Sequence, residues 1–235
     1  MSTSIIEAKL RANGFKIYIT DDKIRLVNDS VTICGVPQNT AVTTSGVFCD
    51  HCYAFASNDE FVAFDIGMNI GVSSLYFAGY ENIKHIYGFE PFAPTFATAL
   101  DNLAGNPRLA PKITPHNFGL GSRNEWLEVH YKKDSPGSMS TAFDRFESES
   151  AVERVEIRDA AETLGPMFAA HDCKILLKID CEGAEKDVLS SLAHGGALGR
   201  VDVIVMEWHF TPPAYLVNLL KKKRLSGLLR PRYPQ

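Results

Sequence analysis

One stretch of the chain combines an acid and two glycines in a pattern that suits nucleotide binding. Residues 61–71 read Phe-Val-Ala-Phe-Asp-Ile-Gly-Met-Asn-Ile-Gly. The apolar run ends at Asp65, and Gly67, Asn69 and Gly71 follow before a helical pattern begins. An apolar strand, a Gly-rich turn and a helix form the nucleotide pocket of open α/β sheets, and glycine allows close approach of backbone to ligand. The sequence therefore predicts a nucleotide-binding turn here.

The acid narrows the choice of nucleotide. A carboxylate at Asp65 would repel a pyrophosphate, but it could hold a cationic amino group together with the backbone around Gly67. S-adenosylmethionine carries an amino group and a sulfonium, so we expect it as the cofactor. An NAD-dependent oxidoreductase remains the alternative, although its usual pattern is Gly-x-Gly-x-x-Gly and this chain has Asp-x-Gly-x-x-x-Gly.

Polar side chains recur at the carboxyl ends of the later predicted strands. They are Glu90 before Pro91, Asn117 before Phe118, then Asp180, Glu182, Glu207 and His209. Ligands of doubly wound sheets bind at these strand ends, so we expect one shared pocket. Each residue alone also has a structural explanation, since an acid such as Asp180 can cap the next helix. Their combination favours a site.

Each of these residues has a predicted role in cofactor binding. Glu90 is expected to accept hydrogen bonds from both ribose hydroxyls, with Pro91 beside it. Asn117 and Phe118 are expected to contact adenine by a hydrogen bond and by ring stacking. Asp180 is expected where the methyl donor and the acceptor meet.

Methyl transfer to an alcohol is faster when a base removes the proton. His209 is the preferred base, because its unperturbed pKa lies close to neutral. Glu182 and Glu207 are the alternatives, acting as the base or as clamps for substrate hydroxyls. Lys178, inside a buried strand, is expected to pair with one of the nearby acids, and the sequence does not say which.

Metal binding is not the favoured interpretation. Asp180, Glu182 and Glu207 could hold magnesium, because hard oxygen ligands suit that ion, but we expect a metal-free site. Cys49 and Cys52 form a Cys-x-x-Cys pair without the second well-spaced pair that structural zinc usually has. Five cysteines, an odd number, without a secretory signal suggest reduced thiols and a cytoplasmic location.

The elements that position these residues alternate from residue 61 onward. Predicted strands cover 61–66, 85–89, 113–118, 126–131, 152–158, 174–179 and 201–206, and predicted helices cover 72–80, 93–103, 160–168, 184–192 and 215–223. This order predicts an α/β fold with a Rossmann-like, doubly wound, mostly parallel sheet. Residues 1–58 form an expected N-terminal α+β extension with a helix at 5–13, a hairpin at 15–27 and a strand at 31–36, and residues 59–235 form the main domain.

Composition limits the partners. The 235 residues are 45% hydrophobic and carry a net charge of -4, which fits one large domain and gives no reason to expect nucleic acid. The chain lacks an apolar run long enough for a membrane span. The basic cluster at 221–224 suits a solvated helix end. The expected partner is a small-molecule or glycan acceptor, and the oligomeric state stays open.

Four motifs resemble those of the FkbM-type methyltransferases, and a Ser-containing loop is similar too. They are Phe64–Ala78, Tyr87–Phe92, Leu177–Glu185 and Val203–His209, with the loop at Gly137–Ser140. The resemblance implies a class I fold that uses S-adenosylmethionine, and O-methylation of a sugar or secondary metabolite. It assigns cofactor binding to Asp65, Gly67, Gly71 and Glu90. The third motif is the most specific and departs only at Cys181.

The C-terminus departs further from the pattern that the resemblance implies. Class I methyltransferases close the sheet with an antiparallel hairpin, whereas Arg230–Pro234 makes a poor strand. We therefore expect a shortened C-terminal hairpin, and a non-catalytic domain that binds S-adenosylmethionine is a second alternative. A nucleic-acid methyltransferase is disfavoured, because Asp180–Gly183 is not the expected Asn/Asp-Pro-Pro-aromatic tetrad.

Overall fold

A computed structural model describes residues 3–131, 151–209, 213–221 and 228–229. The loop predicted at 132–140, with its Ser-containing motif, lies outside the described residues. So do residues 222–224 of the basic cluster and the poor strand at 230–234.

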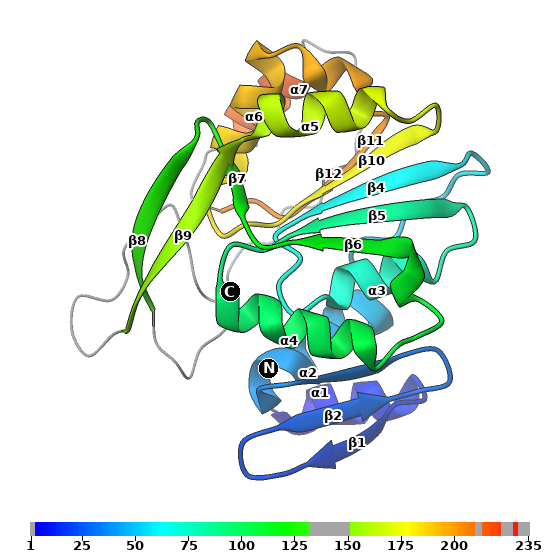
Figure 1. Cartoon of the computed structure of the whole chain (residues 1–235). Helices are drawn as coiled ribbons and strands as arrows, with labels where there is room; N and C mark the ends of the chain where they lie inside the picture. Colours follow the sequence, from blue (N-terminus) through cyan, green and yellow to red (C-terminus); the bar gives the residue numbers. More distant parts are fainter. Residues whose placement is uncertain (1–2, 132–150, 210–212, 222–227, 230–235) are drawn as a thin grey trace.

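The centre of the molecule is a parallel sheet (Figure 1), as the alternating pattern predicts. Its six strands run in the order β12 (Leu228–Leu229), β11 (Val203–Met206), β10 (Lys174–Ile179), β4 (Phe61–Ile66), β5 (Ile83–Phe89) and β6 (Ile113–His116). Every neighbouring pair is parallel. All six residues of β4 are buried, as expected for a central strand that is covered on both faces.

Helices cover both faces of the sheet, which confirms the doubly wound class. In Figure 1, α3 (Val72–Ala78) and α4 (Ala93–Ala104) lie below the sheet, and α5 (Ala160–Ala169), α6 (Glu185–His194) and α7 (Pro213–Lys221) lie above it. Short helical turns η2 (Ala110–Lys112) and η3 (Ala197–Arg200) precede β6 and β11. Each face has its own apolar core, one containing Leu75 and the other Leu164.

A second sheet projects from the side of the main one (Figure 1). It consists of β7 (Gly119–Gly121), β9 (Ala151–Asp159) and β8 (Glu125–Tyr131), with β9 in the middle. β8 runs antiparallel to β9, and β7 runs parallel to it. The sequence predicts β8 and β9 within a residue of their observed ends but does not predict β7.

The N-terminal elements pack against the α3 and α4 face. The predicted helix and hairpin are present as α1 (Thr3–Ala12), β1 (Lys16–Ile19) and β2 (Ile24–Val27), and β3 (Thr32–Gly35) completes an antiparallel sheet. Their core is continuous with that of the main sheet, because Leu26 and Leu75 belong to one cluster. The division of the chain near residue 58 stays a prediction.

The sequence does not predict the next segment, α2 (Pro37–Thr44) and the π-helix η1 (Ser45–Cys49). The helix sequence, Pro-Gln-Asn-Thr-Ala-Val-Thr-Thr, is polar and β-branched and has little amphipathic pattern. Its one sequence signal is Pro37 in the first turn. This segment matters below because it reaches the pocket.

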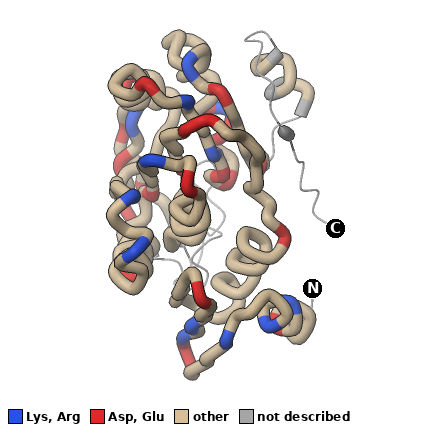
Figure 2. Tube along the Cα trace, turned by 90° about the vertical axis from the view of Figure 1, so that its right-hand side faces the viewer, with Lys and Arg blue, Asp and Glu red and all other residues tan. Residues whose placement is uncertain are grey.

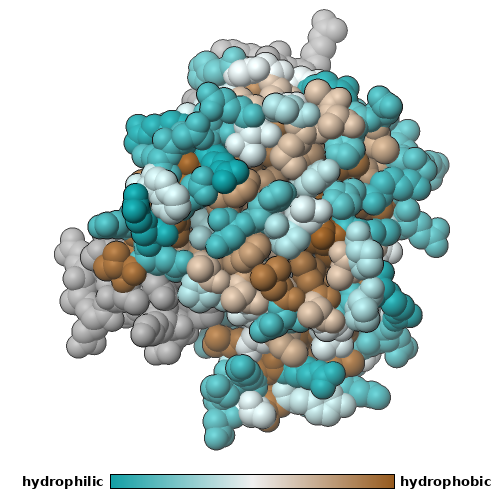
Figure 3. Space-filling model, viewed as in Figure 1, coloured by the Kyte–Doolittle hydropathy of each residue, from teal (hydrophilic) through white to brown (hydrophobic). Residues whose placement is uncertain are grey.

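Charged residues of both signs and one apolar patch are visible on the molecule. Acidic and basic residues are interspersed along the chain (Figure 2). One face is largely hydrophilic with an apolar patch near its centre, in the region of α4 (Figure 3). Among the described residues, no helix has the length and apolar character to cross a membrane.

Candidate functional site

A pocket lies at the carboxyl ends of β4, β5, β10 and β11, where the sequence predicts it. Seven of the predicted site residues line it: Gly67, Asn69, Glu90, Pro91, Asp180, Glu182 and Glu207. The others, namely Asp65, Gly71, Asn117, Phe118 and His209, lie behind or beside the part of its wall that the described residues form. The wall also includes residues of α2, of η1 and of the segment that follows.

The turn after β4 brings two strand ends into backbone contact. Gly67 has a φ of 77°, and a Cβ at this position would lie 1.9 Å from the carbonyl oxygen of Asp180. No residue with a side chain fits there without moving β10. Gly71, with a φ of 86°, begins α3 from behind the pocket wall. Gly67 is therefore required because the turn after β4 lies against the end of β10 at Asp180. Both residues line the pocket.

Asp65 lies beneath the pocket and is fully buried. Its Oδ2 accepts hydrogen bonds of 2.6 Å from the hydroxyls of Ser73 and Ser74. Its Oδ1 lies 2.9 Å from Nζ of Lys178, its register partner on β10. The Asp65 carboxylate thus supports the Gly-rich turn and α3 from below. Asp65 is also the acid that pairs most closely with Lys178, which the sequence alone leaves open.

Lys178 connects this buried acid to the pocket. Its amine donates a 2.6 Å hydrogen bond to the carbonyl oxygen of Gly67 and lies 4.0 Å from Oδ2 of Asp180. Burial disfavours the charged amine, but the carboxylates of Asp65 and Asp180 outweigh it and raise the pKa of Lys178. The lysine is therefore a fixed cation between two acids.

Glu90 lines the pocket at the end of β5. One carboxylate oxygen accepts from the backbone N–H of Asn69 and the other from that of Phe92, each at 3.1 Å. Burial raises the pKa of Glu90 to about 7, although both backbone donors oppose this rise. The carboxylate is therefore fixed in orientation and changes protonation near neutral pH.

Asn117 and Phe118 stand behind the wall. The side chain of Asn117 donates to the backbone carbonyls of Glu90 and Pro91, at 2.9 and 3.2 Å. Phe118 packs in the core below an Arg158 guanidinium, 3.9 Å from its ring centroid. The strand predicted to reach residue 118 ends at His116. As a result Gly119 and Leu120 face the pocket instead.

Tyr53 is a site residue that the sequence does not predict. Its hydroxyl donates a 2.6 Å hydrogen bond to Oδ2 of Asp180, and its side chain also lines the pocket. Burial and the carboxylate of Asp180 raise the pKa of Tyr53 well above its usual value, so the phenol stays protonated. No local pattern identifies this tyrosine, because its partner lies 127 residues further along the chain.

Acids surround His209 at the β10 and β11 ends. Nδ1 lies 2.9 Å from Oε1 of the fully buried Glu185, and Nε2 lies 3.9 Å from Glu182 and 4.0 Å from Glu207. The bond to Glu185 and the other carboxylates raise the pKa of His209 to about 9, against the effect of burial. His209 is therefore mainly a cation near neutral pH, unlike the unperturbed histidine that the sequence analysis assumes.

Glu185 also fixes the loop that carries Glu182. Its Oε1 accepts from the backbone N–H groups of Cys181 and Gly183 at 3.3 and 3.0 Å. Glu182, between them, has a φ of 53°, a conformation that residues other than glycine rarely adopt. One buried carboxylate thus holds both the strained loop and the imidazole.

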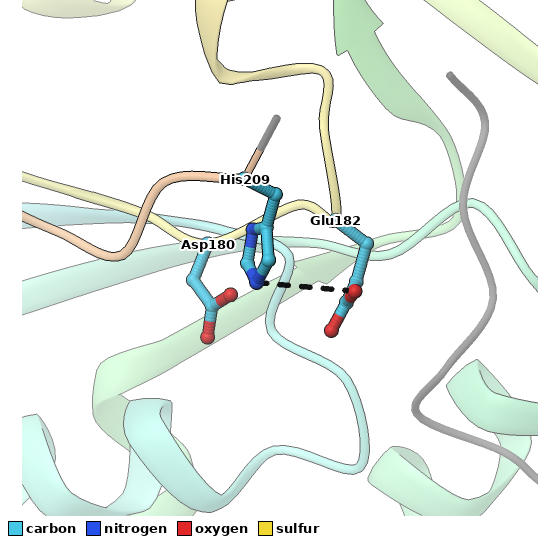
Figure 4. A group of neighbouring side chains, drawn as sticks. All are labelled: Asp180, Glu182 and His209. Atoms are coloured by element: carbon cyan, nitrogen blue, oxygen red, sulfur yellow. Dashed lines mark ion pairs between the residues drawn. The ribbon is translucent and has the colours of Figure 1, made fainter. Parts of the chain in front are cut away.

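Three side chains in this region converge closely enough to share an ion. Figure 4 shows Asp180, Glu182 and His209 directed toward one another, and one ligand atom from each lies within 4.8 Å of the others. Carboxylate and imidazole donors could accommodate a divalent cation. A metal-free site, expected from the sequence, remains a prediction.

A family model described as a methyltransferase FkbM domain matches residues 65–222. The match covers every predicted site residue and leaves out Tyr53 together with the N-terminal wall of the pocket.

Three relatives show moderate identity. Methyltransferase 1 of Beauveria bassiana is 28% identical over 200 residues, with 75% of each chain covered. Methyltransferase sdnD of Sordaria araneosa is 29% identical over 174 residues, covering 62% of this chain and 66% of that protein. The AMB antimetabolite synthetase AmbE of Pseudomonas aeruginosa is 28% identical over 198 residues, which are 69% of this chain but 9% of the synthetase.

A crystal structure of methyltransferase FkbM from Methylobacillus flagellatus KT is also similar. It has a TM-score of 0.40 and 18% sequence identity, and it covers 65% of this chain and 34% of the other.

Proposed function

We propose that this chain, which belongs to the FkbM methyltransferase family, transfers a methyl group from S-adenosylmethionine to a hydroxyl oxygen of a small molecule or glycan. Family membership makes the chain a methyltransferase. The donor is inferred from the pocket, and the oxygen acceptor from the resemblance to the FkbM-type methyltransferases. One observation carries the proposal: buried Glu90, half-buried Gly67 and Asp180 line the same pocket at neighbouring strand ends.

Glu90 is the proposed ligand of the ribose hydroxyls. Each of its oxygens already accepts one backbone N–H, and a carboxylate oxygen has capacity for a further donor. The adenine would pack between Pro91, Phe92 and Leu120, which line the same end of the pocket. With these contacts, the nucleoside of the cofactor would lie on the β5 side of the pocket.

The amino acid part of the cofactor would then extend toward β10. Asp180 and the backbone around Gly67 and Asn69 are the proposed ligands of its ammonium group, because these groups line the pocket. Asp65 would contribute through Ser73, Ser74 and Lys178 rather than by direct contact. Two cationic groups on the cofactor suit a region with this surplus of carboxylates.

Glu182, Glu207 and His209 are the proposed acceptor side. The substrate oxygen would attack the sulfonium methyl carbon, the carbon–sulfur bond would break, and S-adenosylhomocysteine would leave. Most of the rate gain would come from alignment of oxygen and methyl carbon.

The substrate proton must pass to a base on this side. With a pKa of about 9, roughly one His209 in a hundred is neutral near pH 7. If His209 is the base, turnover should rise toward alkaline pH. Glu182 and Glu207 are the alternative bases, with the imidazolium beside them.

Cofactor binding tests the proposal directly. Isothermal titration calorimetry should show binding of S-adenosylmethionine and S-adenosylhomocysteine, and much weaker binding of NAD. Equal or tighter NAD binding would contradict the assignment and favour the oxidoreductase alternative.

A second experiment separates an enzyme from a binding domain. A panel of glycans and hydroxylated metabolites would be incubated with the protein and cofactor labelled in the methyl group. Transfer to an oxygen acceptor supports the proposal. Cofactor binding without transfer to any acceptor would favour the non-catalytic alternative.

A further inference from the structure

We infer that Tyr53 is a positioning residue that holds the carboxylate of Asp180 in place for the amino acid part of the cofactor. The inference rests on the function proposed above. Tyr53 lies outside residues 65–222, so the family match does not assign it. It would act through Asp180 and not on the reacting atoms.

The contact between the two side chains is short and largely enclosed. The Tyr53 hydroxyl lies 2.6 Å from Oδ2 of Asp180. Tyr53 is only 7% exposed, whereas the Asp180 side chain is 26% exposed and lines the pocket. A bond from a buried donor to one oxygen of a pocket-facing carboxylate sets the orientation of the whole group.

The neighbouring cation holds Asp180 less closely. Nζ of Lys178 lies 4.0 Å from the same Oδ2, but 2.9 Å from Asp65 and 2.6 Å from the carbonyl oxygen of Gly67. The Lys178 amine therefore makes its closest contacts with Asp65 and with the turn at Gly67, and not with Asp180. Of these two partners the phenol lies nearer to Oδ2, and its removal would leave the oxygen with the more distant amine.

The ring of Tyr53 is itself held in place. Its centroid lies 6.4 Å from that of Phe77 on α3, and Nζ of Lys178 lies 5.4 Å from the ring. A phenylalanine could keep both ring contacts and lose only the hydroxyl. This makes Tyr53→Phe a selective probe of the bond to Asp180.

The backbone before Tyr53 has an unusual path that carries the residue to the pocket. The helix α2 continues as the π-helix Ser45–Cys49, an irregularity common at functional sites. His51 then has a φ of 51° and lies 3.1 Å from the hydroxyl of Tyr76. Val47 and Cys52 line the pocket on the same segment. The segment is therefore part of the site and not only a packing element.

The experiment compares two ligands that differ in the amino acid part. S-adenosylhomocysteine has this part, whereas 5′-methylthioadenosine keeps the nucleoside and lacks it. Calorimetry with Tyr53→Phe should show S-adenosylhomocysteine binding weakened about 10-fold, as for one lost hydrogen bond to a charged group. Binding of 5′-methylthioadenosine and the melting temperature should stay as in the wild type.

Two further variants test the route through Asp180. Tyr87→Phe is the control, because the Tyr87 hydroxyl contacts His171 at 3.1 Å and neither residue is among the described residues that line the pocket; it should bind both ligands normally. The double variant Tyr53→Phe/Asp180→Ala should bind S-adenosylhomocysteine no more weakly than Asp180→Ala alone, because without the carboxylate the Tyr53 hydroxyl has no group to position.

Three outcomes would count against the inference in different ways. Unchanged S-adenosylhomocysteine binding by Tyr53→Phe would overturn it, and so would an equal loss for both ligands, which indicates a general structural role. Additive losses in the double variant would overturn the route through Asp180. A wild-type protein that binds neither ligand would instead overturn the proposed function on which the inference rests.

Discussion

The two ends of the pocket are built differently. At the β4 and β5 ends, Gly67 and Glu90 are held by backbone contacts, and Asp65 supports them with every oxygen paired inside the protein. At the β10 and β11 ends, Glu182 and His209 are part-exposed and lie 3.9 Å apart. The rigid end, at β4 and β5, suits the proposed cofactor, whereas the open end, at β10 and β11, gives the proposed acceptor access to charged side chains.

The largest expected effect comes from breaking the ion pair between Asp65 and Lys178, which lies below the rigid end. Asp65→Ala should leave Lys178 buried without its closest carboxylate. Removing one partner of a buried ion pair typically costs about 3–5 kcal/mol of stability. Urea unfolding should show a loss of this size, together with the loss of cofactor binding. Near-normal stability and affinity would mean that the rigid end does not depend on this pair.

A control variant separates charge from shape at the same position. Asp65→Asn keeps the volume and can still accept hydrogen bonds from the hydroxyls of Ser73 and Ser74. It removes the charge that faces Lys178, so it should also be destabilised, though less than Asp65→Ala. If Asp65→Asn matched the wild type, the pairing with Lys178 would contribute nothing to the fold.

Glu90→Ala should have the next largest effect, on binding more than on folding. Hydrogen bonds to charged groups contribute about 1.5–3 kcal/mol each, so the affinity for S-adenosylhomocysteine should fall roughly 100-fold. In the wild type, affinity should rise as the pH passes about 7, the pKa of Glu90, because the ionised carboxylate is the better acceptor. A pH-independent affinity in the wild type would remove Glu90 as the ribose ligand.

At both ends of the pocket, the sequence locates lining residues that stand in short motifs, whereas Asp65, Asn117 and Phe118 are expected to contact the cofactor and are not among the described residues that line the pocket. Gly67, Asn69 and Glu90 lie in short motifs at strand ends, where local pattern alone determines their place. Asp65 could also have been assigned as buried, because it stands in a strand whose neighbours are all apolar, and a buried acid needs a partner. What sequence reasoning misses depends on contacts between distant segments.

Tyr53 and His209 illustrate this limit. The partner of Tyr53 is 127 residues away, and α2 and η1, which precede it, lack an amphipathic pattern. His209 is predicted as a site residue from its position after β11, but its raised pKa comes from Glu185 on α6 and from Glu182. Burial and pairing of this kind are set by tertiary structure, so an isolated motif does not reveal them.

His209 should make the stability of the open end depend on pH. Its pKa is raised from 6.5 to about 9, so its stabilising effect is fully present below about pH 6.5 and is lost as the pH rises to about 9. The free energy of unfolding should fall over this range by roughly 2–3 kcal/mol. His209→Gln should flatten this dependence. A wild-type protein equally stable at both pH values would contradict the ion pairing at Glu185.

The smallest expected effect tests whether the two ends act separately. Treatment with EDTA should leave the affinity for S-adenosylhomocysteine unchanged, because its proposed ligands, namely Glu90, Asp180 and the backbone around Gly67, are expected to bind it without an ion. Turnover should also survive chelation if the carboxylates around His209 act without a metal, as the sequence analysis expects. Turnover that is lost with EDTA and restored by magnesium would instead assign an ion to Asp180, Glu182 and His209. A cofactor affinity that also fell with EDTA would show that the ion acts through Asp180, a residue that the cofactor and the acceptor would then share.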